Sequence, residues 1–162
     1  MPYTPTAPTI TLCDDLVTFL AAACDPYSPS SVRRAYLHRI DLKATEGRHV
    51  IFFPTGYDNR PATRGHDFYT HRITVLTFER YVDAADAAVT VPQEWVDERV
   101  DFVHTQIVNG LDFYRDGVRP SFGRNVVTLS ADVPEIYDAE KLNQQKEFWC
   151  AVEMVFEEQI TA

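Results

Sequence analysis

The strongest constraint on this chain is an alternation of apolar side chains near its C-terminal end. Alternation with a period of two is typical of a β-strand that buries one face. The intervening positions become more polar towards the end of the segment, so we expect the opposite face to be only partly covered. A strand of this kind needs a second layer of structure against its apolar face. The alternating residues, within the predicted strand 147–158, are Phe148, Cys150, Val152, Met154 and Phe156.

Two segments with helical spacing can supply that layer. The first runs from Thr11, whose hydroxyl is the predicted N-cap, to about Cys24. The second starts after Pro92 and ends near Gly110, where glycine favours a C-terminal cap. The apolar stripe of the first is Leu12, Leu16, Phe19 and Leu20, and that of the second is Val96, Val100, Val103, Ile107 and Leu111.

Further strands are predicted from β-branched and aromatic runs. Residues 68–81 have apolar side chains at both parities, which favours a sheet covered on one side and partly covered on the other. The other predicted strands are 31–41, 49–53 and 125–130. The order α-β-β-β-α-β-β predicts an α+β fold, with a mainly antiparallel sheet of about five strands and two main helices on one face. Residues 1–8 are predicted to be an extended N-terminal arm and residues 9–162 a single domain.

Residues 54–67 differ from the segments on either side. They contain two glycines, two prolines and no periodicity that forms a core. This composition predicts a long loop between two strands, and such loops are often functional or mobile. We expect it to be mobile in an isolated subunit and to become ordered at an interface through Arg60, Arg64 and His66.

Composition excludes several classes of protein. The chain has 162 residues, enough for one domain with its own core. Three cysteines without a C-x-x-C spacing argue against a disulfide framework or a zinc ribbon and favour a reducing compartment. The N-terminal residues do not have the pattern of a signal peptide, and no apolar run reaches membrane-spanning length.

Charge is unevenly distributed along the chain. The net charge of −9 argues against binding to the outside of a nucleic acid. Residues 31–81 carry a net +4, whereas residues 82–116 and residues 132–158 each carry −6. Such a division permits electrostatic pairing between copies of the chain, although chance clustering on a solvated surface gives the same counts.

Common catalytic motifs are absent from the sequence: it has no nucleotide-binding glycine loop, no nucleophile elbow and no H-E-x-x-H. The best metal-like group is His66, Asp67 and His71, which His38 or His49 from adjacent strands could join, and ordinary sheet or surface histidines are the alternative. We therefore expect no catalytic residue, no metal and no cofactor. The carboxylates of the second helix are expected on its solvent face, and Cys150 is expected in the core. These carboxylates are Glu94, Asp97, Glu98 and Asp101.

Trp95 and Phe102 lie two helical turns apart, on a stripe rotated away from the apolar stripe of the second helix. Large aromatic residues off the core are covered either by a loop of the same chain or by another subunit. We expect this stripe, with Arg99, at a subunit interface. The competing interpretation is that residues 114–124 fold back over it.

The order of these segments over residues 10–160 resembles the tail terminator proteins of long-tailed bacteriophages, also called tail completion or head–tail joining proteins. The resemblance rests on DDLVTFLAAA, RAYLHRIDL, HVIFFP, HRITVLTFERYVDA, EWVDERVDFVHTQIV and FWCAVEMVFEE. It implies a non-enzymatic virion protein of the tail and neck, assembled in the host cytoplasm, that forms a homo-oligomeric, hexameric ring. The ring caps the tail tube and joins it to the head connector.

The implied partners are the tail tube protein and the head–tail connector protein, with no membrane. DNA would pass through without specific binding, and the exposed carboxylates of the second helix would face the lumen. Another phage neck protein, a head–tail adaptor or stopper, is the alternative within the same class. A small metal-binding enzyme that uses His66, Asp67 and His71 is the alternative from another class.

Overall fold

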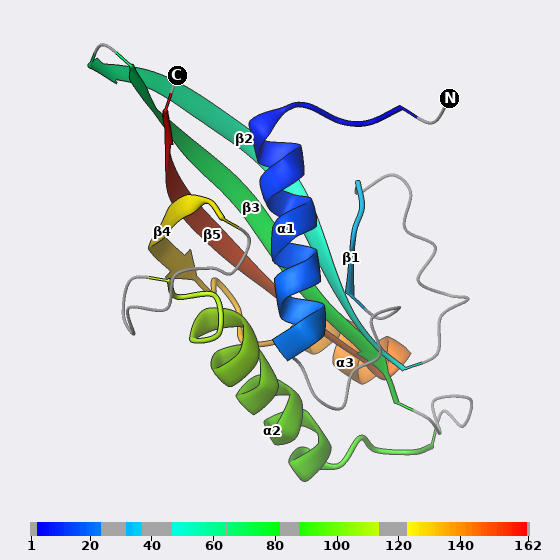
Figure 1. Cartoon of the computed structure of the whole chain (residues 1–162). Helices are drawn as coiled ribbons and strands as arrows, with labels where there is room; N and C mark the ends of the chain where they lie inside the picture. The colour runs from blue at the N-terminus through cyan, green and yellow to red at the C-terminus, as the bar shows by residue number, and fades with distance from the viewer. Residues whose placement is uncertain are drawn as a thin grey trace.

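The computed structural model describes residues 3–23, 32–36, 47–63, 65–81, 88–113 and 123–161. Its helical elements are α1 (Pro8–Ala23), α2 (Gln93–Phe102), the π-helix η4 (Val103–Val108) and α3 (Ala139–Gln145). Its strands are β1 (Val32–Arg34), β2 (Arg48–Thr63), β3 (His66–Arg80), β4 (Asn125–Asp132) and β5 (Glu147–Thr161). The predicted α+β class is confirmed (Figure 1).

The strands form one sheet in the order β1-β2-β3-β5-β4. β1 runs parallel to β2, and the other neighbours are antiparallel, so the sheet is mainly antiparallel as predicted. β2 and β3 form a long hairpin that pairs from Arg48 with Glu79 to Thr63 with His66. β5 follows β3 along its whole length, from Arg80 with Glu147 to His66 with Thr161.

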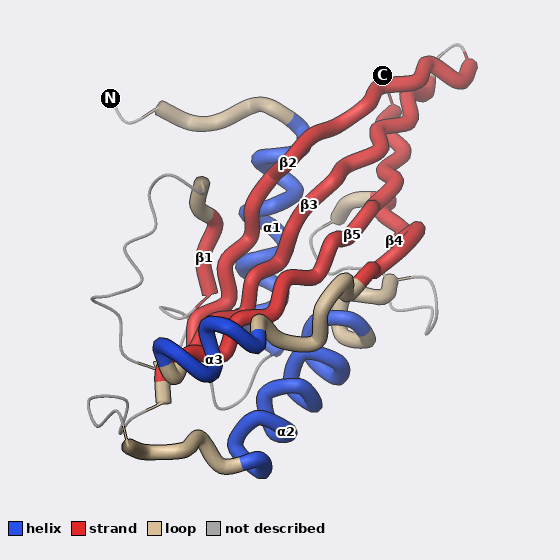
Figure 2. Tube along the Cα trace, turned by 180° about the vertical axis from the view of Figure 1, so that it is seen from behind, coloured by secondary structure: helices blue, strands red, loops and turns tan. Residues whose placement is uncertain are grey.

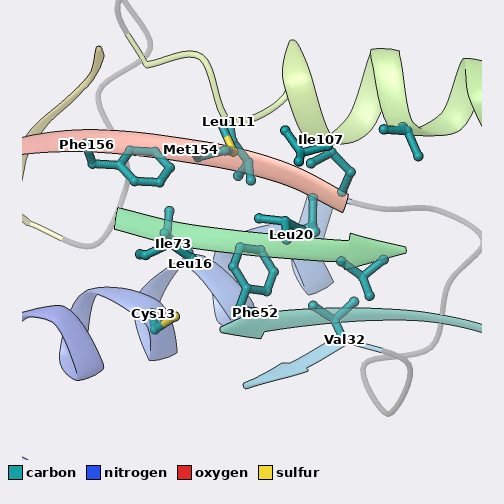
Figure 3. Packing of buried hydrophobic residues seen from close by; sticks show 14 of the residues in the cluster. Cys13, Leu16, Leu20, Val32, Phe52, Ile73, Ile107, Leu111, Met154 and Phe156 are labelled. Atoms are coloured by element: carbon teal, nitrogen blue, oxygen red, sulfur yellow. The ribbon is translucent and has the colours of Figure 1, made fainter. Parts of the chain in front are cut away.

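One face of the sheet carries the main core, because α1 and α2 pack against it (Figure 1). The alternation predicted in the last strand is confirmed: its five apolar side chains are buried against this layer. Figure 3 shows how Phe52, Ile73 and Met154 from neighbouring strands meet Leu16 of α1 and Ile107 of η4. Burying such side chains contributes about 1.5–3 kcal/mol each, which makes this face the main source of stability.

The other face of the sheet is covered only in part. Ile51, Phe53 and Leu76 form a smaller buried cluster there, beside Trp149 and α3. Figure 2 shows that α3 crosses only the lower part of this face, while the upper part of β2, β3 and β5 carries no helix. The prediction of one covered and one partly covered face is confirmed.

Helix α3 was not predicted. It has seven residues and none of them is buried, so the sequence has no apolar periodicity from which this helix could be predicted. The helix is instead defined by its ends. The carboxylate of Asp138 accepts a hydrogen bond from the backbone N–H of Lys141 at 3.0 Å, and Lys146 adopts a left-handed conformation at the C-cap.

Several predicted boundaries change. α1 begins at Pro8, so Thr11 lies inside the helix and its hydroxyl donates to the carbonyl of Pro8 instead of capping. The second helix ends where predicted, but its last turns form a π-helix. β4 extends two residues beyond its predicted end. Of the predicted strand 31–41 only Val32–Arg34 is a strand, and residues 31 and 37–41, like Cys24, lie outside the described residues.

The prediction of a loop over residues 54–67 is wrong, because β2 continues to Thr63 and β3 begins at His66. The prolines fit because register shifts occur between Pro54 and Gly56 and between Pro61 and Thr63. We call residues 56–63 of β2 and 65–72 of β3 the hairpin arm. The arm projects beyond the helices at the top of Figure 1. Whether it moves in an isolated subunit stays a prediction.

Candidate functional site

The base of the hairpin arm is held to α1 by a buried network of polar side chains. Nδ1 of His71 lies 2.9 Å from Oγ1 of Thr9, and Nε2 of His71 lies 3.0 Å from Oε2 of Glu158. Arg124 donates to Oε1 of Glu158 at 2.6 Å and to Oδ2 of Asp15 at 2.8 Å. The network therefore joins α1, β3 and β5 to Arg124, the residue directly before β4.

The hydroxyl, imidazole and carboxylate of this network resemble the components of a nucleophilic site. The exposed fraction of Thr9 is 4% and that of His71 is 0%, so no substrate can reach the hydroxyl. Burial alone would raise the pKa of Glu158, but hydrogen bonds from His71 and Arg124 and the charge of Arg124 hold that pKa below its ordinary value. A carboxylate kept ionised by a guanidinium supports an anchoring role for the group rather than proton transfer.

The alternative metal group is not brought together. Both ring nitrogens of His71 already contact Thr9 and Glu158. His66 lies five residues before His71 in the same strand, so the two side chains belong to opposite faces of the sheet. Within the described ranges, no cluster of three His, Cys, Asp or Glu residues is placed to hold a metal ion. Of the other predicted contributors, His49 is in β2 and His38 lies outside the described residues.

A second network fixes α2 to the opposite end of the sheet. Glu79 of β3 accepts hydrogen bonds from Arg48 at 2.6 Å and from Arg99 at 2.8 Å. Arg99 also donates to Glu98 at 2.8 Å. The side chains of Arg48 and Arg99 are 9% exposed, so both guanidinium groups are occupied by their contacts with Glu79 within the chain. That Arg99 lies at a subunit interface stays a prediction, but its guanidinium already has carboxylate partners within the chain.

The premise that Trp95 and Phe102 lie off the core is wrong. Phe102 is buried within the main cluster, and Trp95 packs against that cluster while half-buried. The guanidinium of Arg48 lies 4.8 Å from the ring centroid of Phe102, and that of Arg99 lies 4.1 Å from the ring of Trp95. The stripe belongs to the fold of the monomer. Of residues 114–124, those from 114 to 122 lie outside the described part of the chain, so the competing interpretation is not tested.

The predicted inward stripe of this helix is correct only in its second half. Val103 and Ile107 are buried as predicted, but Val96 and Val100 are half-buried. The inward positions of the first turns are taken by Arg99 and Phe102. The π-helix adds a residue per turn, so the face that meets the sheet rotates along the helix. Uniform 3.6-residue spacing could not predict that rotation.

The carboxylates of α2 are exposed, as predicted for a solvent face: these are Glu94, Asp97, Glu98 and Asp101. Glu98 also contacts Arg48 at 3.4 Å. That these groups line a lumen stays a prediction.

The basic residues of the hairpin arm have different surroundings. The side chain of Arg60 is 75% exposed, with its guanidinium 5.9 Å from the ring of Phe68 and 3.8 Å from Glu157. His66 is half-buried at the start of β3. Arg64 lies outside the described residues.

An apolar groove of about 310 Å³ lies between the second helix and the segment that follows β4. Val100, Val103 and Val108 line one wall, and Val133 and Ile136 line the other. The groove also contacts Cys150, whose thiol pKa is raised by burial to about 11, and it is bordered by Asp101 and His104. The exposed fraction of Ile136 is 58%, so a large apolar side chain stands open at the border. No sequence pattern predicted this groove, because residues 133–138 have no periodicity.

No helix in the described part of the chain has both the length and the apolar character needed to cross a membrane. No protein-family model matches the chain, and no curated protein matches it.

Proposed function

We propose that this protein is a structural subunit of a bacteriophage neck, which forms a ring that caps the tail tube and joins it to the head connector. The observation that carries the proposal is the hairpin arm. Residues 57–61 of β2 are all exposed, although a strand on the surface of a single folded domain normally buries every second side chain. A strand that is open on both faces is suited to contact with another protein.

The polar chemistry of the described residues supports the same proposal. The two buried networks use their arginines and carboxylates to fix helices to the sheet. Apart from α3 between β4 and β5, the order of the elements agrees with the order on which the resemblance to tail terminators rests. The acidic balance suits a ring through which DNA passes, because exposed carboxylates repel phosphates. A hexamer, the tail tube protein and the connector protein are the assembly and partners that this resemblance implies.

The proposal is tested by the state of assembly of the purified chain. Mass photometry over a range of concentrations is expected to show a ring, with six copies as the expected number, and negative-stain microscopy is expected to show a central opening. A chain that stays monomeric at all concentrations contradicts the proposal.

A second experiment separates a terminator from an adaptor or a stopper. The protein is added to growing tail tubes made from the tube protein of the same phage. A terminator is expected to bind one end of each tube and stop its growth. Binding to the connector without any effect on tube length would identify the protein as an adaptor or stopper instead.

A further inference from the structure

We infer that the tip of the hairpin arm, through Arg60 and Pro61, docks into the apolar groove of a second copy of the chain. This inference rests on the proposed function, since it names the two surfaces that would join neighbouring subunits of the ring. It follows from the charge of the tip, the charge of the groove and the distance between them.

The tip is basic. Residues 59–66, NRPATRGH, contain two arginines and one histidine and no carboxylate. Arg60 is largely exposed, and its nearest carboxylate, Glu157, is 3.8 Å away. Pro61 beside it is also exposed and offers a compact apolar ring. Asp58 and Asp67 flank this segment, and Asp58 is paired with Arg72. The tip therefore presents a largely exposed arginine, in a long ion pair with Glu157, beside an apolar group.

The groove is apolar inside, and Asp101 and His104 are the polar residues among those that line it. Residues 94–101, which run into the helical wall, include four carboxylates, of which Glu98 is paired within the chain with Arg48 and Arg99. Residues 132–140 on the other wall include four carboxylates and no basic residue. A basic tip and an acidic groove are complementary, and such complementarity speeds association and fixes the register of an interface. Arginine is also among the residues that contribute most to the energy of interfaces.

The tip cannot enter the groove of its own chain. Thr161 of β5 pairs with His66 at the level of the tip, whereas Cys150 on the same strand contacts the groove. Eleven residues of strand separate these two levels, a distance of about 35 Å. Figure 1 shows the arm at the upper end of the sheet and α2 at the lower end. The occupant must therefore be another molecule, and the second copy carries a tip of matching charge.

A contact between two different surfaces of identical subunits is heterologous, and it produces a closed ring when its rotation closes. This property gives the inference a specific test. A subunit with a damaged tip keeps a working groove, and a subunit with a damaged groove keeps a working tip. The two variants together should therefore assemble, although neither assembles well alone.

The test uses Arg60→Glu as the tip variant and Asp101→Arg as the groove variant, each examined by mass photometry. Each alone is expected to weaken assembly at least about tenfold. An equimolar mixture is expected to form rings in which the two variants alternate, because each contact joins either two wild-type side chains or two side chains of exchanged charge. The double variant that carries both changes is expected to restore assembly, because the charges are exchanged. Matched controls are Arg33→Glu on β1 and Glu153→Arg on the uncovered face of β5, both at exposed positions.

Circular dichroism of each variant checks that it folds, and a salt titration of the wild-type ring gives a measurement free of substitutions. Rings that dissociate with salt are expected. If wild type forms rings but Arg60→Glu and Asp101→Arg form them equally well, the inference is overturned and the proposed function stands. The groove would then belong to another virion protein. If wild type forms no ring, both the proposed function and the inference are overturned.

Discussion

The two halves of the β2–β3 hairpin belong to the same strands but differ in how far their side chains are buried. In the lower half, Phe52 of β2 is fully buried between its neighbours and α1. In the upper half, Tyr57 on the same strand and the same face is 51% exposed, and its ring contacts only Tyr69 among the described aromatic side chains. The structure of the lower half is therefore stabilised by packing within the chain. The upper half keeps its backbone pairing through two register shifts, and residues 57–61 of β2 have no packed layer over them.

The largest expected difference between the two halves is in stability. Phe52→Ala should lower the free energy of unfolding by about 3–5 kcal/mol, because it removes a fully buried ring and leaves a cavity. Tyr57→Ala, the matched control on the same strand, should change it by less than about 0.5 kcal/mol. Urea unfolding of the monomer at neutral pH measures both. Equal losses would show that the arm belongs to the folded core.

The junction between the two halves depends on Glu158. Glu158→Gln should cost about 3 kcal/mol, because it leaves the guanidinium of Arg124 without its buried ionic partner. The same change should increase amide exchange at the base of the arm, since His71 also loses its carboxylate. Unchanged exchange there would show that strand pairing alone holds the arm in place.

The same residue predicts a pH dependence. Because the folded state lowers the pKa of Glu158 from its ordinary 4.5, its contribution to stability is complete above that pH and is lost as the pH falls through the lower folded pKa. The difference in unfolding free energy between wild type and Glu158→Gln should therefore shrink on acidification. Urea unfolding at a series of pH values from neutral downward measures it. A difference that stays constant would contradict the assigned role of the carboxylate.

A smaller effect is expected at the other network. Arg99→Met should cost about 2 kcal/mol, since Glu79 keeps Arg48 as a partner. Arg60→Met in the arm, where the arginine is largely exposed, should cost less than about 0.5 kcal/mol. Thermal or urea unfolding compares them. A larger loss from Arg60→Met than from Arg99→Met would contradict the distinction between a lower half stabilised by contacts within the chain and an exposed upper half.

The smallest expected effect concerns the arm in an assembled ring. The amides of residues 57–61 should exchange about tenfold more slowly in the ring than in the monomer, which corresponds to about 1.4 kcal/mol. The amides of the lower half should keep their rates. Hydrogen exchange with mass spectrometry measures both regions in one sample, and an arm that exchanges equally fast in both states would lie outside every interface.

The sequence correctly predicted those segments in which a single pattern of apolar residues determines which face is buried. The alternation from Phe148 to Phe156 required only that one face be buried, and that face is buried. The hairpin arm was missed because proline and glycine usually indicate loops. At Pro54 and Pro61 the shifted register of an edge strand removes the need for a paired N–H. That accommodation depends on where the strand lies in the sheet, which local composition does not encode.

The candidate site was harder to predict, because its contacts join residues distant in sequence. The sequence showed Arg99 as one charge among the carboxylates of a helix. In the structure it is buried because Glu79, twenty residues earlier, offers both carboxylate oxygens. The network at the base of the arm spans from Thr9 to Glu158. The residues of neither network are spaced in a pattern that could be recognised in one sequence. The exposure of the α2 carboxylates, in contrast, was predicted from helical periodicity.

The two register shifts of β2 have a consequence for how copies of this chain meet. In the described residues β1 pairs with β2 only from Val50 to Phe52, so the arm carries a long outer strand edge. Identical chains with exposed strand edges are at risk of adding strand to strand without limit. Interrupted by Pro54 and Pro61, this edge is a poor template for such growth. If the arm docks into a second copy as inferred, recognition is left to side chains, and single substitutions can change it without rebuilding the sheet.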